Sequence, residues 1–468
     1  MNTLFYPASH IRPSNGYAGA ATDELSIDRI TFRDLEIFEA PAGTPSLYNQ
    51  LNRTRTYGGS IALRNRMRRP WCASGRIKGV QDSLRFIAEH RELFGAIPNE
   101  GMIAALERYI HSGLPIITAV NRLEWLLEAI EVRFTEGRDY VLIRRGIEHT
   151  IRLIQLVHGL AIQCELAGAA GELAMLSIDV KATSCSLIEI LSAYRDLDNP
   201  SFRTVLRLDR TVRHDDRNGI VKLMQLAFEF DALVAMSDVM QSNGWITPEI
   251  TNDPSELVVQ DLVHPFLNHA VSNSLILHEP RRLVFLTGPN MAGKTTFLRS
   301  LGVSLYLAHL GMGVPAASFR FCPCDALFTA LTVTDSLMQG ISFFRAEALR
   351  LKQIVGAAVN GQRVIGIMDE PFMGTNLKDA IDAAGTVLTG LADSRHGQFF
   401  VSSHLIELAD SLAKHTGVEF RRFEANELTG TLSFDFVLRP GVSDQRLGMR
   451  VLREEGVIDL VDRIPRSR

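Results

Sequence analysis

The sequence predicts a mainly α-helical domain followed by an α/β domain with a parallel sheet. Long apolar repeats at helical spacing dominate residues 28–250, whereas short apolar runs alternate with helical segments over residues 251–468. Residues 1–27 are expected to form an N-terminal extension. Because 46% of the 468 residues are hydrophobic, both domains have enough apolar side chains to bury a core.

The helical prediction depends on apolar repeats. Two sets of side chains fall at i, i+4, i+7 and i+11, which places each set on one face of a helix. They are Leu123, Leu127, Ile130 and Phe134, and Ile147, Ile151, Ile154 and His158. A third helix is predicted over 220–242, and it ends at Asn243 and Gly244, a common pair at helix C-termini.

The α/β prediction depends on three short apolar runs at 282–287, 364–368 and 399–403, which are typical of buried parallel strands. The pattern changes after Pro248, so the domain boundary is placed near residue 250. The stretch 300–319 has no Asp, Glu, Lys or Arg and is long enough to imitate a membrane span. Histidine, glycine and proline interrupt it, which favours a buried helix followed by a turn.

Charge and cysteine content narrow the class of protein. Lys and Arg number 49 against 53 Asp and Glu, a net charge of −4, which excludes a broadly basic nucleic-acid coat. Five cysteines do not make a secreted disulfide framework, and no signal peptide is visible, so a cytoplasmic location is expected. Cys322 and Cys324 have no second pair at zinc spacing, so a buried structural pair is favoured over a metal site.

The strongest local signal is a glycine-rich loop between an expected strand and an expected helix. It fits G-x-x-x-x-G-K-[ST] and consists of Gly288, Pro289, Asn290, Met291, Ala292, Gly293, Lys294 and Thr295, with Thr296 directly after them. In this context backbone N–H groups close around phosphate oxygens, and the helix adds its positive end. Lys294 is expected to reach the β- and γ-phosphates, and the Thr295 hydroxyl to bind Mg²⁺. The sequence therefore predicts a site for ATP and Mg²⁺.

Acidic residues follow another expected strand, as a phosphate loop requires. Asp369 is expected to hold Mg²⁺ through water, and Glu370 to polarise the attacking water as general base. The alternative, a pair of acids at a helix start, is disfavoured by the neighbouring phosphate loop. His404, after the run 399–403, is interpreted as a γ-phosphate sensor, with a structural histidine as the alternative. Lys294, Glu370 and His404 are thus the candidate catalytic residues.

These segments carry a resemblance. TGPNMAGKTTFLRSLG, DSLMQGISFF, MDEPFMGTN and SSH, in this order and at these separations, resemble the ATPase domain of the MutS family of DNA mismatch-repair proteins. ITFRDLEIFEA, SLYNQLNRTRTYGGSIALRNRMRRPW and RIKGVQDSLRFIAEHRELF are similar to the opening of that family's helical core and lever. FEFDALVAMSDVMQSNGWITPEI resembles the returning lever, and RPGVSDQRLGMRVLREEGV the dimerising C-terminal stretch. Over about 28–457, the resemblance implies a core and lever domain followed by a P-loop ATPase domain of the ABC class.

The resemblance implies roles for single residues of the nucleotide site. Asn290 and Met291 would shape the phosphate loop, and Ser342 would be offered to the γ-phosphate of the facing subunit. The loop 374–376 would cross the dimer interface, and the serine of DSLMQGISFF would make two composite ATP sites there. Val271 matches a position beside the adenine, although Ala270 stands where the family often has an aromatic residue.

One further position, Phe436, falls where a base-stacking side chain of the C-terminal strand is expected. A core aromatic in a strand is the alternative there. Phe343, Pro371 and Phe372 depart from the family pattern and leave the rate of hydrolysis open.

The sequence also departs from the family at the level of whole domains. The core-like segment begins near residue 28, which leaves no room for the mismatch-reading and connector domains. Between about 101 and 217 the sequence lacks a strand-rich, lysine-rich insert like the DNA clamp, and no nuclease motif is visible. Direct mismatch recognition of the usual kind is therefore not expected.

Two groups of basic residues are candidates for DNA contact through phosphate neutralisation. The first group is Arg64, Arg66, Arg68, Arg69, Arg76 and Lys78, and the second, near the expected lever tip, is Arg203, Arg207, Arg210, Arg213 and Arg217. The alternative is a solvated helix face, or pairing with acids such as Asp209, Asp215 and Asp216.

Two functional hypotheses follow. The first is a homodimeric, Mg²⁺-dependent ATPase that couples nucleotide state to helical levers on duplex or branched DNA in mismatch repair or recombination. The second is an ATP-gated dimer that binds another DNA-repair protein and makes little direct DNA contact. A transporter ATPase is disfavoured by the absent LSGGQ-type signature, and no membrane partner is expected.

Overall fold

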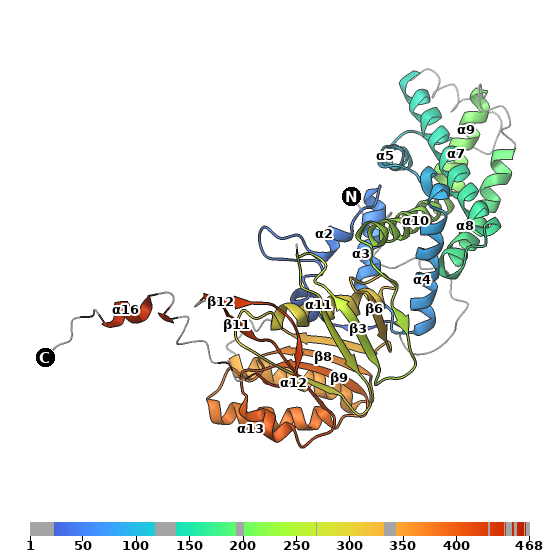
Figure 1. The fold of residues 1–468 in the computed structure, drawn as a ribbon. Helices are drawn as coiled ribbons and strands as arrows, with labels where there is room; N and C mark the ends of the chain where they lie inside the picture. The colour runs from blue at the N-terminus through green and yellow to red at the C-terminus, as the bar shows by residue number, and fades with distance from the viewer. Residues whose placement is uncertain are drawn as a thin grey trace.

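The computed structural model describes residues 23–117, 137–192, 201–267, 269–331, 343–428, 431–443, 445, 452–453, 456–462 and 464. Two bodies share this part of the chain (Figure 1). One is a bundle of helices, and the other is a set of sheets covered by helices. They meet along α11 (Lys294–His309), which lies between the larger sheet and the bundle.

The helical body contains most of the elements that precede residue 244. They are α2 (Leu47–Leu51), α3 (Tyr57–Arg68), α4 (Ser74–Glu89), η1 (Arg91–Ala96), α5 (Glu100–Ile110), α7 (Gly137–Leu166), α8 (Gly171–Ser192), α9 (Phe202–Arg210), η2 (Thr211–Asp215) and α10 (Arg217–Asn243). The antiparallel pair α7 and α8 extends away from the sheets with α9 beside it (Figure 1).

The sheet body is built on seven strands in the order β1-β7-β8-β9-β5-β10-β13. They are β1 (Ser26–Ile27), β7 (Ala326–Ala330), β8 (Val364–Asp369), β9 (Gly397–Ser402), β5 (Leu283–Thr287), β10 (Val418–Arg422) and β13 (Arg439–Pro440). All neighbours are parallel except β13, which runs antiparallel to β10. The three predicted strands are confirmed as β5, β8 and β9, and they form the centre of this sheet.

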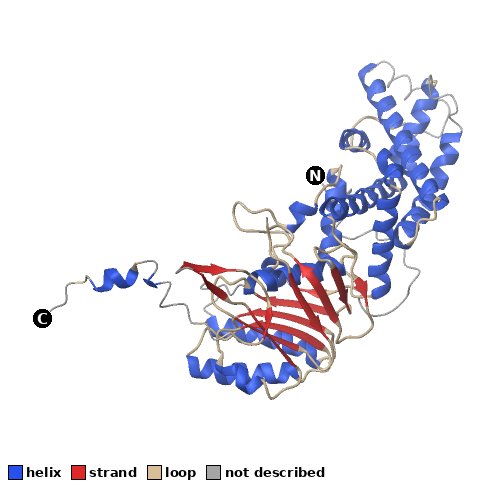
Figure 2. Ribbon diagram, in the orientation of Figure 1, coloured by secondary structure: helices blue, strands red, loops and turns tan. Residues whose placement is uncertain are grey.

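Two smaller sheets and several helices complete this body. The four-stranded sheet has the order β2-β6-β3-β4 and consists of β2 (Glu249–Ile250), β6 (Ser318–Phe321), β3 (Leu257–Leu262) and β4 (Asn273–Leu277). The other small sheet is the hairpin of β11 (Ala425–Leu428) and β12 (Thr431–Phe434). The helices are α1 (Arg29–Asp34), α11, α12 (Phe343–Val359), α13 (Leu377–Ala392), α14 (Glu407–Leu412) and α16 (Val457–Asp462). Figure 2 shows helices on both faces of the larger sheet.

Burial on both faces explains why the central strands are continuous apolar runs. Along β5, Leu283 and Phe285 belong to the core shared with α12 and α13. Val284 and Leu286 point the opposite way and belong to the core shared with α11 and the helical body. Side chains alternate across a strand, so a strand covered on both sides needs apolar residues at every position.

Two helical predictions are confirmed, and one lies outside the described residues. The face containing Ile147, Ile151 and Ile154 is buried in α7, each side chain being at most 5% exposed. The helix predicted over 220–242 is α10, and Gly244 ends it with a left-handed φ of 62°. The repeat at 123–134 is in a segment that the structure does not describe.

The stretch 300–319 is a buried helix end followed by a turn and a strand, as expected. None of the helices that the structure describes has the length and apolar character to span a membrane. Cys324 is buried, and its backbone N–H donates to Nε2 of His309 at 3.0 Å. Among the described residues no group of three or more His, Cys, Asp or Glu side chains could hold a metal ion.

The start of the described chain belongs to the sheet body. The sequence instead predicts an N-terminal extension up to residue 27 and a helical domain from residue 28. Ser26 and Ile27 pair in parallel with Ala326 and Leu327 as the edge strand β1. Asp34 of α1 is 1% exposed and accepts hydrogen bonds from the Thr329 hydroxyl at 2.8 Å and from the backbone N–H of Leu331 at 2.9 Å. A two-residue strand gives too short a pattern to be predicted from sequence.

A buried polar network connects α5, α9 and η2 within the helical body. Asp209 accepts from the Tyr109 hydroxyl at 2.6 Å and from Nε of Arg213 at 2.6 Å, and both Asp209 and Arg213 are almost fully buried. Arg213 also donates to the carbonyl of Leu114 at 2.9 Å and to that of Pro115 at 3.2 Å. Its guanidinium therefore joins η2 to the chain that follows α5.

This network corrects the DNA-contact prediction for Arg213. A side chain 4% exposed and paired with an internal carboxylate does not face solvent phosphates. The pairing alternative with Asp209 applies instead. Arg66 of the first basic group is also buried, between Glu172 and Glu229 at 2.7 and 2.6 Å. Both arginines hold helices together.

Replacing Arg213 by alanine should destabilise the fold, because it leaves the Asp209 carboxylate buried without its cation. Breaking a buried pair in this way costs about 3–5 kcal/mol. Equilibrium urea unfolding measures the loss, and Arg207→Ala, on the exposed face of α9, is the matched control. Equal stabilities for the two variants would contradict the structural role of Arg213.

Candidate nucleotide site

The glycine-rich loop connects the end of β5 to the start of α11. Gly288 has a φ of 139° and Gly293 a φ of 105°, and the non-glycine Met291 also has a positive φ, of 67°. A Cβ added to Gly288 would lie 2.6 Å from the carbonyl oxygen of Phe423, so only glycine fits without a backbone shift. The turn brings the loop close around the N-terminus of α11, where unpaired N–H groups favour an anion.

Lys294 is folded into this loop. Its side chain is 4% exposed, and Nζ donates to the carbonyl of Gly288 at 2.8 Å and to that of Pro289 at 3.2 Å. Burial lowers the pKa of the ammonium, and the charges of Glu370 and Asp369 offset part of that effect. The positive charge is therefore held where a phosphate group would meet the loop.

Hard oxygen donors meet next to Lys294. The Thr295 hydroxyl, in the first turn of α11, donates to Oδ2 of Asp369 at 2.5 Å. The other oxygen of Asp369 accepts from the hydroxyl of Ser402, at the end of β9. Because β5, β8 and β9 are parallel neighbours, their carboxyl ends place these groups at one edge of the sheet. A hydroxyl and a carboxylate in contact are a donor set that fits Mg²⁺.

Glu370 lies between two basic groups. Its Oε1 is 2.5 Å from Nε2 of His404 and 3.7 Å from Nζ of Lys294. The His404 contact lowers the pKa of the Glu370 carboxyl, and Lys294 contributes in the same direction against the effect of burial. Glu370 has a φ of 49° and its N–H donates to the Ser402 carbonyl at 3.1 Å. Strained backbone of this kind is often found at functional sites.

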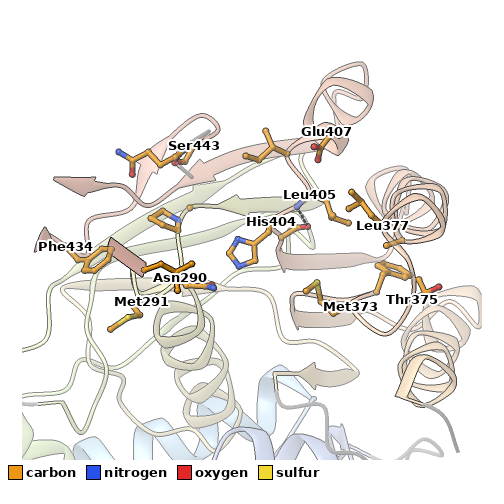
Figure 3. A pocket seen from close by; sticks show the side chains of 18 residues that line it. Asn290, Met291, Met373, Thr375, Leu377, His404, Leu405, Glu407, Phe434 and Ser443 are labelled. Atoms are coloured by element: carbon orange, nitrogen blue, oxygen red, sulfur yellow. Dashed lines mark hydrogen bonds between the residues drawn. The ribbon is translucent and has the colours of Figure 1, made fainter. Parts of the chain in front are cut away.

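A pocket of about 770 Å³ opens beside these groups. Figure 3 shows the His404 ring in its middle, with Asn290 and Met291 on one side and Met373, Thr375 and Leu377 on the other. The pocket has the volume of a typical small-molecule site. The phosphate loop, the residues after β9 and the loop after β8 thus share one cavity.

The segment that carries this site is similar in sequence to known proteins. The family model described as MutS domain V matches residues 284–463, which include the phosphate loop, Glu370 and His404. The DNA mismatch repair protein MutS of Desulfovibrio desulfuricans is 32% identical over 251 residues, 52% of this chain. Residues 284–463 therefore match the domain V that MutS proteins share, and the chain is similar to MutS over about half of its length.

Other relatives give the same result over a similar stretch. The DNA mismatch repair protein MutS of Aquifex pyrophilus is 28% identical over 280 residues, 59% of this chain, and that of Lawsonia intracellularis is 29% identical over 249 residues. The aligned parts cover 27%, 32% and 28% of the three relatives. The chain therefore spans less than a third of the length of these MutS proteins, and domain V is the ATPase domain of the family.

Of the two residues that the MutS resemblance assigns to the base, Phe436 lies beside the phosphate loop, and Val271 is connected to it through Asn273. Asn273 donates to the carbonyl of Phe436 at 3.0 Å and to that of Val271 at 3.3 Å, so it holds both backbones together. The Phe436 ring is 3.3 Å from where a Cβ of Gly293 would stand. Phe436 lies after β12 with a φ of 57° and is 42% exposed, which contradicts the alternative of a core aromatic in a strand.

The other residues of the MutS motifs differ in burial and in their position relative to the pocket. Ser342 lies outside the described residues, so its position relative to the site stays a prediction. Thr296, in the first turn of α11, is exposed. Ala292 is 1% exposed and belongs to the core under the loop. The loop 374–376 borders the pocket and ends at Asn376, which caps α13 by accepting from the N–H of Asp379 at 3.0 Å.

The arginines of the second basic group, predicted to contact DNA, also differ in exposure. Arg203 and Arg207 are exposed on α9, whereas Arg210 and Arg217 are half-buried. Arg210 lies 3.4 Å from Asp215. Only part of the predicted cluster therefore presents a cationic surface.

Sequence reasoning assigned no role to three residues of the site. The Ser402 hydroxyl donates to Asp369 and accepts from the backbone N–H of Glu370 at 3.1 Å, so Ser402 links these two acidic residues. Asn273 links Val271 to Phe436, and Glu347 of α12 reaches the loop after β8. Ser402 belongs to the SSH motif, which was a usable signal. Asn273 and Glu347 act through contacts distant in sequence, which no spacing pattern reveals.

Proposed function

We propose that this chain binds ATP with Mg²⁺ and hydrolyses the γ-phosphate, and that it does so as a homodimer acting on DNA in mismatch repair or recombination. The observation that carries the proposal is the contact of Glu370 with both Lys294 and His404 at the edge of the pocket. A general base, a phosphate-binding cation and a sensor are the groups that hydrolysis of a terminal phosphate requires.

The chain's own residues supply binding and proton transfer. The N–H groups of the phosphate loop and the start of α11 bind phosphate oxygens, and Lys294 neutralises their charge. Thr295 and Asp369 would hold Mg²⁺, which neutralises developing charge on the phosphate when bound. Glu370 orients the attacking water and accepts its proton. The His404 contact lowers the pKa of Glu370, so the carboxylate is ionised at neutral pH, as an acceptor of a proton must be.

Val271 and Phe436 frame the position proposed for the adenine. Phe436 offers an exposed aromatic face, and Asn273 fixes the backbones of both residues. Stacking on an aromatic ring binds a base without reading its hydrogen-bonding edge.

Exposed apolar side chains around the pocket support the dimer. Met291, Met373 and Leu377 are 80%, 56% and 62% exposed at its rim. Apolar groups gathered at the mouth of a site are typical of a surface that another chain covers. In the proposed dimer the partner subunit contributes Ser342 to the γ-phosphate, so each site needs both copies. The exposed Leu460 and Val461 of α16 are consistent with a dimerising C-terminal stretch.

A second candidate is the ATP-gated protein-interaction module. Exposed apolar residues on α7 and α8 favour it, since Leu166 at the end of α7 is 82% exposed and Ile178 of α8 is 53% exposed. The exposed Arg203 and Arg207 favour DNA instead. The net charge of −4 leaves DNA binding dependent on such local patches.

Glu370→Ala should retain ATP but lose turnover, because binding residues remain and the base is removed. Loss of a general base lowers kcat by about 10²–10⁴-fold. Steady-state phosphate release and binding of a fluorescent ATP analogue measure the two effects. Asp382→Ala, an exposed carboxylate on α13, is the control and should keep wild-type turnover. Unchanged hydrolysis in Glu370→Ala would remove Glu370 from this role.

Replacing Arg203 and Arg207 together by alanine should weaken ATP-dependent DNA binding and flatten its salt dependence. Each lost phosphate contact lowers the slope of log K against log salt by about 0.9. Fluorescence anisotropy with paired, mismatched and four-way-junction DNA at several salt concentrations measures it. The control changes two exposed charges of the sheet body, Arg395→Ala with Lys414→Ala. No DNA binding by the wild-type protein, with hydrolysis intact, would favour the protein-interaction module.

A further inference from the structure

One buried carboxylate outside the phosphate site has an unusual environment. Glu347, in the second turn of α12, is 5% exposed. Its Oε2 accepts from the backbone N–H of Gly374 at 3.2 Å. Its Oε1 is buried and has no hydrogen-bond partner among the residues that the structure describes.

Such an arrangement is costly for stability. Burial raises the pKa of Glu347, and the N–H groups of Gly374, Met373 and Phe372 offset only part of that effect. A buried charged group with an unsatisfied oxygen destabilises a fold, and an apolar side chain of similar size would avoid the cost. A group of this kind therefore calls for an explanation beyond packing.

Glu347 connects two segments of the proposed catalytic machinery. Gly374 lies in the loop 370–376, which begins at the proposed base Glu370 and ends at the cap of α13. Within this loop the Phe372 side chain is buried, at 3% exposure, and its backbone has a left-handed φ of 76°. The surrounding packing therefore holds this part of the loop in one conformation. At the other end, α12 begins directly after Ser342 in the sequence.

The next turn of α12 is fixed to the sheet body. Arg350 donates to the carbonyl of Thr329 at 2.8 Å and to the Thr31 hydroxyl at 2.9 Å, and it pairs with Asp28. Arg350 and Glu347 also line a small cavity of about 100 Å³ together with Asp369 and Pro371. Glu347 thus shares a small cavity with the acidic end of β8.

We propose that Glu347 is a positioning residue that attaches the loop 370–376 to α12 and thereby sets the position of Glu370. The inference rests on the proposed function, because it needs an ATPase in which Glu370 is the base.

Glu347→Ala removes the link, and Glu347→Gln keeps an acceptor oxygen but removes the charge. Both should bind ATP within about two-fold of wild type, because no phosphate ligand changes. Turnover should fall about ten-fold or more in Glu347→Ala, since misplacing a catalytic group strongly slows chemistry. Glu347→Gln should be intermediate. Lys352→Ala, on the exposed side of α12, is the control.

Thermal unfolding separates positioning from simple structural support. Because the pKa of Glu347 is raised in the folded state, ionised Glu347 lowers stability as the pH rises above the usual range of a glutamate. Glu347→Gln should therefore unfold at a temperature no lower than wild type at pH 7.5 while hydrolysing ATP more slowly. Arg33, Arg350 and Asp369 border the same cavity and are unchanged in the variant.

The outcomes distinguish this inference from the proposed function. Wild-type turnover in both Glu347 variants, with an active wild-type enzyme, would overturn the positioning role and leave the ATPase intact. Loss of turnover only in proportion to loss of folded protein would also overturn it. An inactive wild-type protein would instead refute the proposed function.

Discussion

The burial of α11 is the constraint on which the rest of the structure depends. Its N-terminus forms the phosphate loop with Lys294, and its C-terminal half lies against the helical body. There the buried Tyr306 hydroxyl donates to the carbonyl of Met67, and the carbonyl of His309 accepts from the N–H of Trp71 at 2.8 Å. A sixteen-residue helix spans about 24 Å. Because close-packed interiors transmit strain, α11 is the direct route by which a change at the phosphate loop would reach the helical body.

A second rigid connection runs on the opposite face of the sheet. Arg350 attaches α12 to α1 and β7, and Glu347 attaches it to the loop after β8. The phosphate loop and the loop after β8, which both border the nucleotide pocket, are thus each attached to a helix with fixed contacts elsewhere in the fold. ATP can shift the protein between two conformations only by binding one of them more tightly. In the proposed mechanism, the contacts of α11 and α12 would be the ones that differ between the two conformations.

Sequence predicted what is local and missed what depends on distant contacts. The phosphate loop and the acids after β8 follow spacing rules, and the central strands show their double burial as apolar runs. The edge strand β1 was missed because two residues carry no period, and Arg213 was misjudged because a run of arginines on a helix does not reveal which one turns inward. The carboxylate Asp209 that pairs with Arg213 was visible only as an alternative. Phe436 could not be separated from a core aromatic until its exposure and left-handed backbone were known.

The most direct test of the account mixes two inactive variants. Lys294→Ala removes the cation of the phosphate loop, and Ser342→Ala removes the side chain proposed to act on the partner's nucleotide. If each site is built from both copies, an equal mixture should recover about a quarter of wild-type ATP turnover, since half of randomly assorted dimers contain one intact site. Steady-state phosphate release from the mixture measures this recovery. Turnover no higher than that of the separate variants would contradict composite sites and, with them, the proposed dimer mechanism.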